Sequence, residues 1–350
     1  MKTFLAAGLG LAAGAGAWAQ GVTMYGTVDL YVAHARSGSS SWTRMQDGGH
    51  TASRLGFRGT EDLGGGLRAG FVLESGISPD TGLGNLPGPE LSFTRQSFVS
   101  LAGAWGQVDL GRMYTPMFYT LFRADPYGLN AVFSPLNLVA ATDAQPGAQA
   151  FAGRASNMVR YRTPQGDGFW LDAAFGFGEA AQASRRSGQF EGAAAGWTGE
   201  RLTLAYAFQR AHGGSATAPL ADPPRTTYQA LSATYKLGDL DLYANHVRVR
   251  SSLAGVPQSR LTSLGARYSF TAVSQLMVEA VDRRVDGSAR RQLGWTLGYD
   301  HHLSRRTTLY ARWLGLGNHA DASATLAGVA VAANSGDAVR VLAAGIRHNF

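Results

Sequence analysis

The sequence predicts an all-β protein, a 16-stranded antiparallel transmembrane β-barrel. Three observations support this fold class. Apolar and polar residues alternate with a period of two through most of the chain, the alternating segments are about ten residues long, and short connections take turns with long ones. Such alternation places apolar side chains on one face of a strand and polar or small ones on the other. A barrel with an apolar exterior and a hydrated interior accommodates all three observations.

The N-terminal segment has the features of a secretory signal peptide. It reads MKTFLAAGLGLAAGAGAWAQ, with one lysine, an apolar stretch and then the small-x-small pattern of Ala17, Trp18 and Ala19. The alternative is a membrane helix, but the 16-residue apolar stretch from Phe4 to Ala19 is short and rich in glycine. We therefore expect residues 1–19 to be cleaved during export and residues 20–350 to form the barrel domain.

The composition limits the classes of partner. The chain carries a formal net charge of +7, and Lys2 and Lys236 are its only lysines, so arginine supplies the positive charge. These arginines are spaced singly along apolar stretches rather than gathered in a basic run, which does not favour nucleic acid as a partner. The absence of cysteine excludes a disulfide framework in an exported protein.

The alternation is clearest in GFWLDAAFGFG. Phe169, Leu171 and Phe175 share one face there, while Trp170 and Asp172 share the other. The sixteen segments with this pattern are 21–35, 52–62, 66–75, 91–102, 105–113, 154–163, 168–177, 190–198, 201–210, 226–235, 240–250, 260–269, 275–283, 290–300, 307–316 and 338–350. Ten residues at about 3.3 Å each, tilted by about 40°, rise about 25 Å, which is the height of an outer-membrane apolar band.

The connections between these segments divide into two kinds. Short links such as 103–104 and 236–239 alternate with long ones such as 36–51, 114–153 and 317–337. Transmembrane barrels have this asymmetry, with short periplasmic turns and longer extracellular loops. A soluble multi-domain β protein is the alternative, but it would have to expose the aromatic face or bury a series of arginines.

Arginine placement tests the barrel hypothesis. An arginine on the lipid face costs about 2 to 4 kcal/mol at the bilayer midplane and about 0 to 1 kcal/mol near the interfaces, so arginines in the middle of strands should point inward. Alternation predicts an inward direction for Arg54, Arg58, Arg68, Arg95, Arg160, Arg162, Arg248, Arg267, Arg312 and Arg347. Arg112, Arg291 and Arg340 have outward parity, and all three lie at the loop ends of their strands.

The chain ends on an aromatic residue in register with the lipid-facing side. Leu342, Ala344, Ile346, His348 and Phe350 share that parity. We therefore expect Phe350 to lie at the periplasmic interface, where the last strand closes the sheet against the first, and to act as a barrel-closure and assembly signal.

Several motifs together resemble the general bacterial porins of Gram-negative outer membranes, particularly the betaproteobacterial and neisserial type. They are VTMYGTVD (22–29), SRLGFRGTEDLGGGLRAGFVLESG (53–76), FTRQSFVSLAGAWGQVDLGRMYTP (93–116), RASNMVRYRTP (154–164) and the final GIRHNF. The resemblance implies a homotrimer of 16-stranded barrels in the outer membrane, with an inward-folded third loop that narrows the pore. That loop corresponds to residues 114–153, in which the acidic side chains are Asp125 and Asp143.

Strand parity and the family positions together suggest a site. The ring of fixed charges at the narrowest level of such a barrel sets its selectivity. The candidates for an anion-selective constriction are Arg54, Arg58, Arg95, Arg154, Arg160 and Arg162, and the acidic lumen partners are Asp29, Glu74, Asp109 and Asp125. The hypothesis is passive diffusion of small hydrophilic solutes and ions with an anion preference, and the expected partners are outer-membrane lipid, lipopolysaccharide and the solutes themselves.

Other functions are less well supported by the residues. A barrel enzyme would need a nucleophile or paired carboxylates with a histidine, and the eight histidines have no such partner at a recognisable spacing. His301 and His302 are adjacent, so in a strand their side chains point to opposite faces and cannot both coordinate one metal ion. We therefore expect no catalysis, no cofactor and no metal. A substrate-specific channel, or an adhesin with a blocked lumen, remains the alternative.

Overall fold

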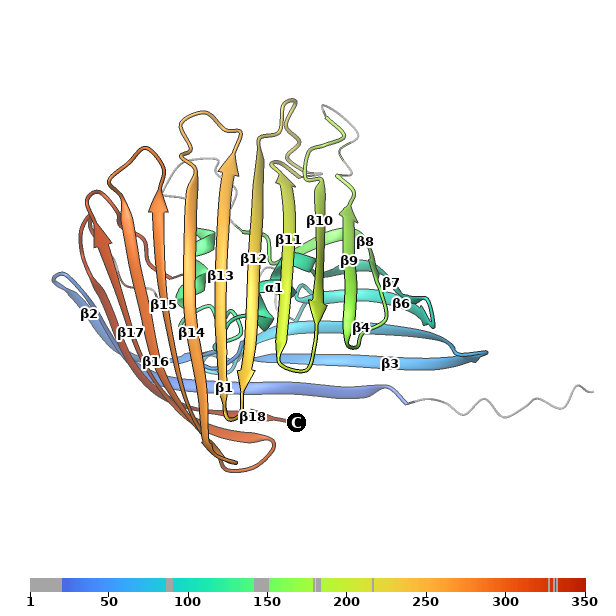
Figure 1. Cartoon of the computed structure of the whole chain (residues 1–350), viewed down its shortest axis with the longest axis horizontal. Helices are drawn as coiled ribbons and strands as arrows, with labels where there is room; N and C mark the ends of the chain where they lie inside the picture. Colours follow the sequence, from blue (N-terminus) through green and yellow to red (C-terminus); the bar gives the residue numbers. More distant parts are fainter. Residues whose placement is uncertain are drawn as a thin grey trace, which may run out of the picture.

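The structure is a computed structural model that describes residues 21–85, 91–141, 151–178, 180, 184–215, 217–326, 328–329, 331 and 333–350. The predicted signal peptide, residues 1–19, lies outside the described residues. Antiparallel strands pair in one continuous sheet that closes on itself, which confirms the predicted fold class (Figure 1). The sixteen wall strands are β1 (Thr23–Ser37), β3 (Arg54–Gly64), β4 (Leu67–Ser78), β6 (Gln96–Gly103), β7 (Gly106–Tyr114), β8 (Arg154–Arg162), β9 (Gly168–Gly176), β10 (Phe190–Thr198), β11 (Leu202–His212), β12 (Arg225–Leu237), β13 (Leu240–Ser251), β14 (Ser259–Thr271), β15 (Ser274–Val285), β16 (Arg291–His302), β17 (Thr307–His319) and β18 (Val339–Asn349).

Two further strands lie in regions that the sequence predicts as long connections. β2 (Ser40–Asp47) pairs with the C-terminal half of β1, from Leu30 to Ser37, whereas β3 pairs with its N-terminal half, from Thr23 to Thr27. β5 (Leu83–Asn85) pairs with the last residues of β4. β2 continues the line of β3 along β1, and β5 lengthens the end of β4, so neither adds a strand to the barrel circumference.

The barrel closes between its first and last strands. β1 and β18 pair over eleven positions, from Thr27 with Asn349 to Ser37 with Val339. Phe350 continues this pairing, because its amide and carbonyl both hydrogen-bond Gly26 at 3.1 Å. A Cβ on Gly26 would lie 2.3 Å from the Phe350 ring, so the ring lies directly over a residue without a side chain. The sheet therefore has no free edge at this seam.

The two faces of the wall differ as the alternation predicts. In β11, Leu204 and Tyr206 are exposed on the outside, whereas Ala205 and Ala207 are buried within. Arg54 and Arg58 share the inward face of β3, and Arg291 lies on the outward face of β16 at its loop end. Arg95 precedes β6 in irregular backbone, where its side chain bonds to inward-facing Glu74.

One predicted direction is wrong. Arg248 faces outward, because it shares the exposed side of β13 with Leu242 while Asn245 and Val247 are buried. Both faces of this strand mix apolar and polar residues, so the alternation alone assigned the wrong face of β13 to the lumen. The physical reason is that Val247 belongs to an apolar cluster inside the barrel, which makes an apolar inward face favourable at this level.

This interior cluster is formed by the long connection between β7 and β8, which folds into the lumen. The connection contains α1 (Pro116–Arg123) and the 3-10 helix η1 (Pro135–Ala140). Thr115 caps α1 by accepting a hydrogen bond from the Phe118 amide, and Pro116 occupies the first turn. The buried residues of the connection within the cluster are Met117, Leu121, Leu129, Val132, Phe133, Leu136, Leu138 and Val139. No helix in the described part of the chain is long and apolar enough to cross a bilayer.

Hydrogen bonds and glycines fix the tip of the connection to the wall. The Tyr127 hydroxyl lies 3.0 Å from the carbonyl oxygens of Met277 and Thr296, on β15 and β16. A Cβ on Gly298 would lie 2.8 Å from the Tyr127 ring. The absence of a side chain at this wall position therefore provides the space in which the tip docks.

Candidate functional site

Two of the cavities in the described part of the lumen meet at a common set of residues. One extends toward the end of the barrel that carries Asn349 and Phe350, and the other extends toward the long-loop end that carries Asp47 and Arg154. The residues that line both cavities are His50, Thr51, Arg54, Phe122, Gly128 and Asn130, and we call them the junction ring. Because the two cavities share these residues, the junction ring is the candidate constriction.

Asp29 positions one side of the junction ring. Its buried carboxylate accepts hydrogen bonds from the His50 amide at 2.7 Å, from the Thr51 amide at 2.6 Å and from the Tyr310 hydroxyl. These bonds hold the segment before β3 against the inner wall. Thr51 Oγ1 then accepts a hydrogen bond from Arg54 Nη2 at 2.6 Å. A buried carboxylate on β1 thus indirectly orients the guanidinium of Arg54.

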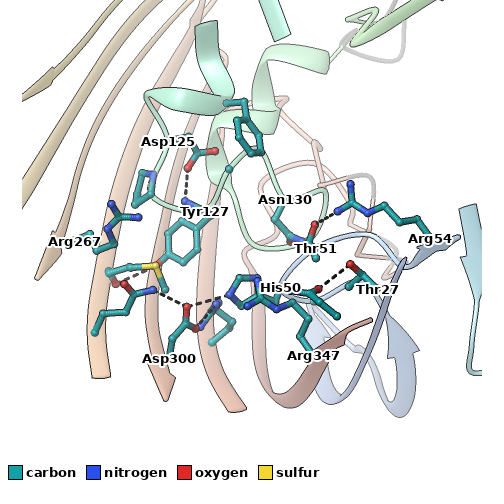
Figure 2. Close-up of a pocket in the computed structure, with 18 of the residues that line it drawn as sticks. Thr27, His50, Thr51, Arg54, Asp125, Tyr127, Asn130, Arg267, Asp300 and Arg347 are labelled. Atoms are coloured by element: carbon teal, nitrogen blue, oxygen red, sulfur yellow. Dashed lines mark hydrogen bonds and ion pairs between the residues drawn. The ribbon is translucent and has the colours of Figure 1, made fainter. Parts of the chain in front are cut away.

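The opposite side of the ring comes from the inward-folded connection. Asn130 Nδ2 donates to the Gly48 carbonyl at 2.7 Å, which links the connection to the segment held by Asp29. His50 lies between Asp300, 3.1 Å from its Nε2, and Arg347, 3.3 Å from its Nδ1 (Figure 2). Segments from distant parts of the sequence therefore surround one passage.

The charge of Arg54 is only partly compensated. Its Nη1 lies 3.9 Å from Glu74 Oε2, whereas Arg95 Nε donates to Oε1 of the same carboxylate at 2.8 Å. One carboxylate therefore faces two guanidiniums, and it accepts a hydrogen bond only from Arg95 of these two. A net positive charge remains beside the junction ring.

Arg95 and Arg154 share a second partner on the long-loop side. Both donate to the hydroxyl of Tyr114, Arg95 at 2.7 Å and Arg154 at 2.5 Å. The guanidinium carbon of Arg154 also lies 4.2 Å from the centre of the Tyr114 ring. A phenol orients the two guanidiniums without neutralising either of them, so Glu74 is the carboxylate that compensates Arg95, and Arg154 keeps its positive charge beside this cavity.

Arg160 and Arg162 are paired with carboxylates. Arg160, which is 3% exposed, binds Asp172 through two hydrogen bonds of 2.7 and 2.5 Å. Arg162 Nη2 lies 2.9 Å from Asp109. Neither arginine is among the described residues that line the two cavities. The structure thus places four of the six predicted arginines beside the two cavities, with Arg95 among them paired to Glu74, and the other two in ion pairs away from these cavities.

Besides Arg54, five arginines line the cavity on the Phe350 side. Arg58 lies in that cavity with its guanidinium 5.3 Å from the centre of the Tyr25 ring. The others are Arg123, Arg267, Arg312 and Arg347. The parity of the strands predicted an inward direction for the last three, whereas Arg123 lies on α1, where no strand parity applies. Burial lowers the pKa of Arg123 from its ordinary value.

The predicted acidic residues act in two ways. Glu74 and Asp109 bind guanidiniums, whereas Asp29 and Asp125 bind the backbone. Asp125 accepts hydrogen bonds from the amides of Tyr127 and Leu129 at 2.8 and 2.6 Å, which shapes the tip of the connection. Burial raises the pKa of Asp125 above its ordinary value. Asp143 lies outside the described residues.

The comparisons with known proteins agree with this geometry. A family model described as Gram-negative porin matches residues 5–313. This chain belongs to the Gram-negative porin family. The porin is 34% identical to outer membrane porin protein 32 of Delftia acidovorans over 100% of both chains. The family resemblance seen in the sequence is thereby confirmed.

Solved structures show the same architecture. The anion-selective porin from Comamonas acidovorans superposes with a TM-score of 0.84 at 28% sequence identity, covering 94% of this chain and 99% of that chain. The trimer form of OmpT from Vibrio cholerae has a TM-score of 0.70 at 14% identity and covers 94% and 99%. The porin therefore resides in the outer membrane, and its wall strands enclose a diffusion channel.

Proposed function

We propose that this porin is a passive channel for small hydrophilic solutes with a preference for anions, and that the junction ring is its constriction. The observation that carries the proposal is the charge around the cavity on the Phe350 side. Six arginines line it, Arg54 among them, against the lining carboxylates of Asp125 and Asp300, and one of the six, Arg267, is paired with Asp241. Asp300 lies 2.6 Å from Arg312, and Asp125 is directed to the backbone, so neither presents a free charge to the passage.

The physical mechanism is electrostatic. Walls of low dielectric concentrate the field of fixed charges at close range, while a Debye length of about 8 Å at physiological salt confines it to the narrow part of the lumen. Guanidiniums on both sides of the junction ring give an anion several weak sites, which supports entry without trapping. The relative from Comamonas acidovorans is described as anion-selective, which supports the same preference here.

The six predicted arginines have different roles in this proposal. Arg54, Arg58, Arg95 and Arg154 attract anions, because they lie beside the cavities with incomplete compensation. Arg160 and Arg162 stabilise the wall through their ion pairs with Asp172 and Asp109. Glu74 and Asp109 orient guanidiniums, whereas Asp29 and Asp125 hold the backbone segments that form the ring.

We further propose that the channel assembles as a homotrimer after cleavage of residues 1–19, and that it catalyses no reaction and needs no cofactor. The trimer form of the Vibrio cholerae protein, which shares this fold, supports the assembly. Outer-membrane lipid and lipopolysaccharide surround it. Phe350, which pairs with Gly26 at the closing seam, is the proposed assembly signal.

Single-channel recording in a planar bilayer tests the anion preference. With a tenfold KCl gradient, the reversal potential of an anion-preferring channel has the sign set by chloride. A reversal potential of the opposite sign would disprove the proposed role of the arginines, and a protein that passes no current would disprove the channel itself.

A further inference from the structure

The outer surface of the barrel carries a row of arginines on four neighbouring strands. In the register of the sheet, each of these residues lies directly opposite the next one. The row consists of Arg248 on β13, Arg260 on β14, Arg284 on β15 and Arg291 on β16, and we call it the outer arginine row. Side chains at directly opposite positions of an antiparallel pair lie on the same face, so four guanidiniums share one side of the wall.

These guanidiniums point to the outside of the barrel. The side chains of Arg260, Arg284 and Arg291 are 56%, 53% and 44% exposed. Arg248 shares the exposed face of β13 with Leu242. The row therefore takes no part in the lumen and is independent of the arginines around the junction ring.

Nearby carboxylates compensate only part of the charge. Asp282 lies 2.9 Å from Arg284 and 2.7 Å from Arg291, and Asp286 lies 3.9 Å from Arg260. In the described part of these strands, the four arginines of the row thus have ion pairs with only two carboxylates. Like charges at directly opposite positions are unfavourable, so an additional anion would stabilise this part of the sheet.

The height of the row on the wall indicates which anion is available. On the same outward faces, Leu293 next to the row and Leu264 and Val278 farther from the loop ends are exposed and apolar. Just above it, the strands end in the connections 252–258 and 286–290, which lie on the same side of the barrel as the long loops. The row is therefore located where acyl chains give way to headgroups, the depth at which arginine on a lipid-facing wall is tolerated.

We propose that the outer arginine row binds the phosphate groups of phosphorylated lipid headgroups in the outer leaflet. Each guanidinium presents a planar fork of donors that matches phosphate oxygens, and a row of four can bridge the phosphates of one headgroup or of neighbouring headgroups. The acyl chains of the same lipid would then cover the apolar band below. This inference rests on the outer-membrane location of the channel but not on its ion selectivity.

Native mass spectrometry of the intact porin in detergent micelles tests the proposal. The probe is diphosphorylated lipid A, and its fully dephosphorylated form serves as the ligand control. The wild-type protein should retain the phosphorylated form preferentially. The Arg260→Gln/Arg284→Gln variant should bind it about ten-fold more weakly, since two charge-assisted contacts are lost while Asp282 keeps Arg291 as its partner.

A matched protein control removes the same charge from the opposite end of the barrel. Arg305→Gln/Arg306→Gln lies in the short turn between β16 and β17 and should bind lipid A as the wild type does. The proposal would be overturned if both variants lost lipid A binding equally. It would also be overturned if the wild type retained the dephosphorylated lipid equally well, or if millimolar inorganic phosphate displaced all of the bound lipid A. Loss of the trimer in the row variant alone would also overturn it, because the row would then face another protomer.

Conductance separates this inference from the proposed channel function. The row variant should pass current with the wild-type reversal potential, which would show that its barrel is folded and that the lost lipid binding is local. A wild-type protein that retains lipid A but prefers cations would leave the row intact and disprove only the anion preference.

Discussion

Replacing Arg54 by glutamine should reduce the preference of the channel for anions. Arg54 lines both cavities and shares Glu74 with Arg95, whose closer hydrogen bond of 2.8 Å persists in the variant. The substitution therefore removes one positive charge from the junction ring without leaving a buried carboxylate unpaired. Glutamine is uncharged and shorter than arginine, so the passage should widen slightly as the charge is lost.

The magnitude follows from Coulomb's law. A unit charge about 5 Å from a passing ion contributes about 0.8 kcal/mol in bulk water. Screening with a Debye length of about 8 Å reduces this to about 0.4 kcal/mol, a factor of about two in the ion's population. Because anions lose that factor and cations gain it, the anion-to-cation permeability ratio should fall about four-fold. At 1 M salt, where the Debye length is about 3 Å, the change should be less than about two-fold.

Reversal potentials of single channels at both salt concentrations measure this ratio. Arg340→Gln is the matched control, because Arg340 is exposed on the outward face of β18 and its removal deletes the same charge outside the lumen. An unchanged ratio in the Arg54 variant, or an equal change in the Arg340 variant, would refute the assignment of Arg54 to the constriction.

Three further substitutions test the docked connection and the seam. Gly298→Ala places a Cβ 2.8 Å from the Tyr127 ring, so it should destabilise the barrel by about 1 to 3 kcal/mol and alter single-channel conductance; an unchanged melting temperature would contradict this packing. Asp125→Asn removes one carboxylate oxygen that accepts hydrogen bonds, so current noise at constant voltage should rise, and equal noise in variant and wild type would argue against its anchoring role. Burial raises the pKa of Asp125, so folding favours its protonated form. The wild type should therefore lose stability as pH rises through that raised value, and the loss should be smaller in the variant. Phe350→Ala removes the ring that covers Gly26 at the seam and should lower the fraction of folded protein in membranes. Gel mobility after mild heating measures that fraction. A folded fraction equal to that of the wild type would exclude the proposed assembly role.

The wall of the barrel could be predicted from the sequence because lipid and water impose opposite demands on alternate residues. All sixteen predicted segments overlap wall strands, and the closing pair of β1 and β18 follows from the same pattern. The alternation failed at Arg248, where the inner face is apolar. There the inward Val247 contacts an apolar cluster rather than water, and a rule that equates inside with polar gives the wrong direction.

The constriction was only partly predictable. Strand parity placed Arg54 and Arg58 inside, but it could not distinguish them from Arg160, whose two hydrogen bonds to Asp172 depend on the register of β8 and β9. His50 and Phe122 lie in connections, where neither parity nor propensity fixes the direction of a side chain. The one available signal was length, since a connection as long as 114–153 is uncommon unless it packs and functions.

The docking of Tyr127 has a consequence for the order in which the protein acquires its structure. Its hydroxyl binds carbonyls 150 and 169 positions further along the chain, so both receiving strands must already be assembled side by side. Neighbouring hairpins can form locally, but the connection can dock across the lumen only after those hairpins have formed. If assembly stopped before the connection docked, the channel would be wider and less selective. Insertion into the membrane and docking of the connection must therefore be closely coupled to protect the cell from such a channel.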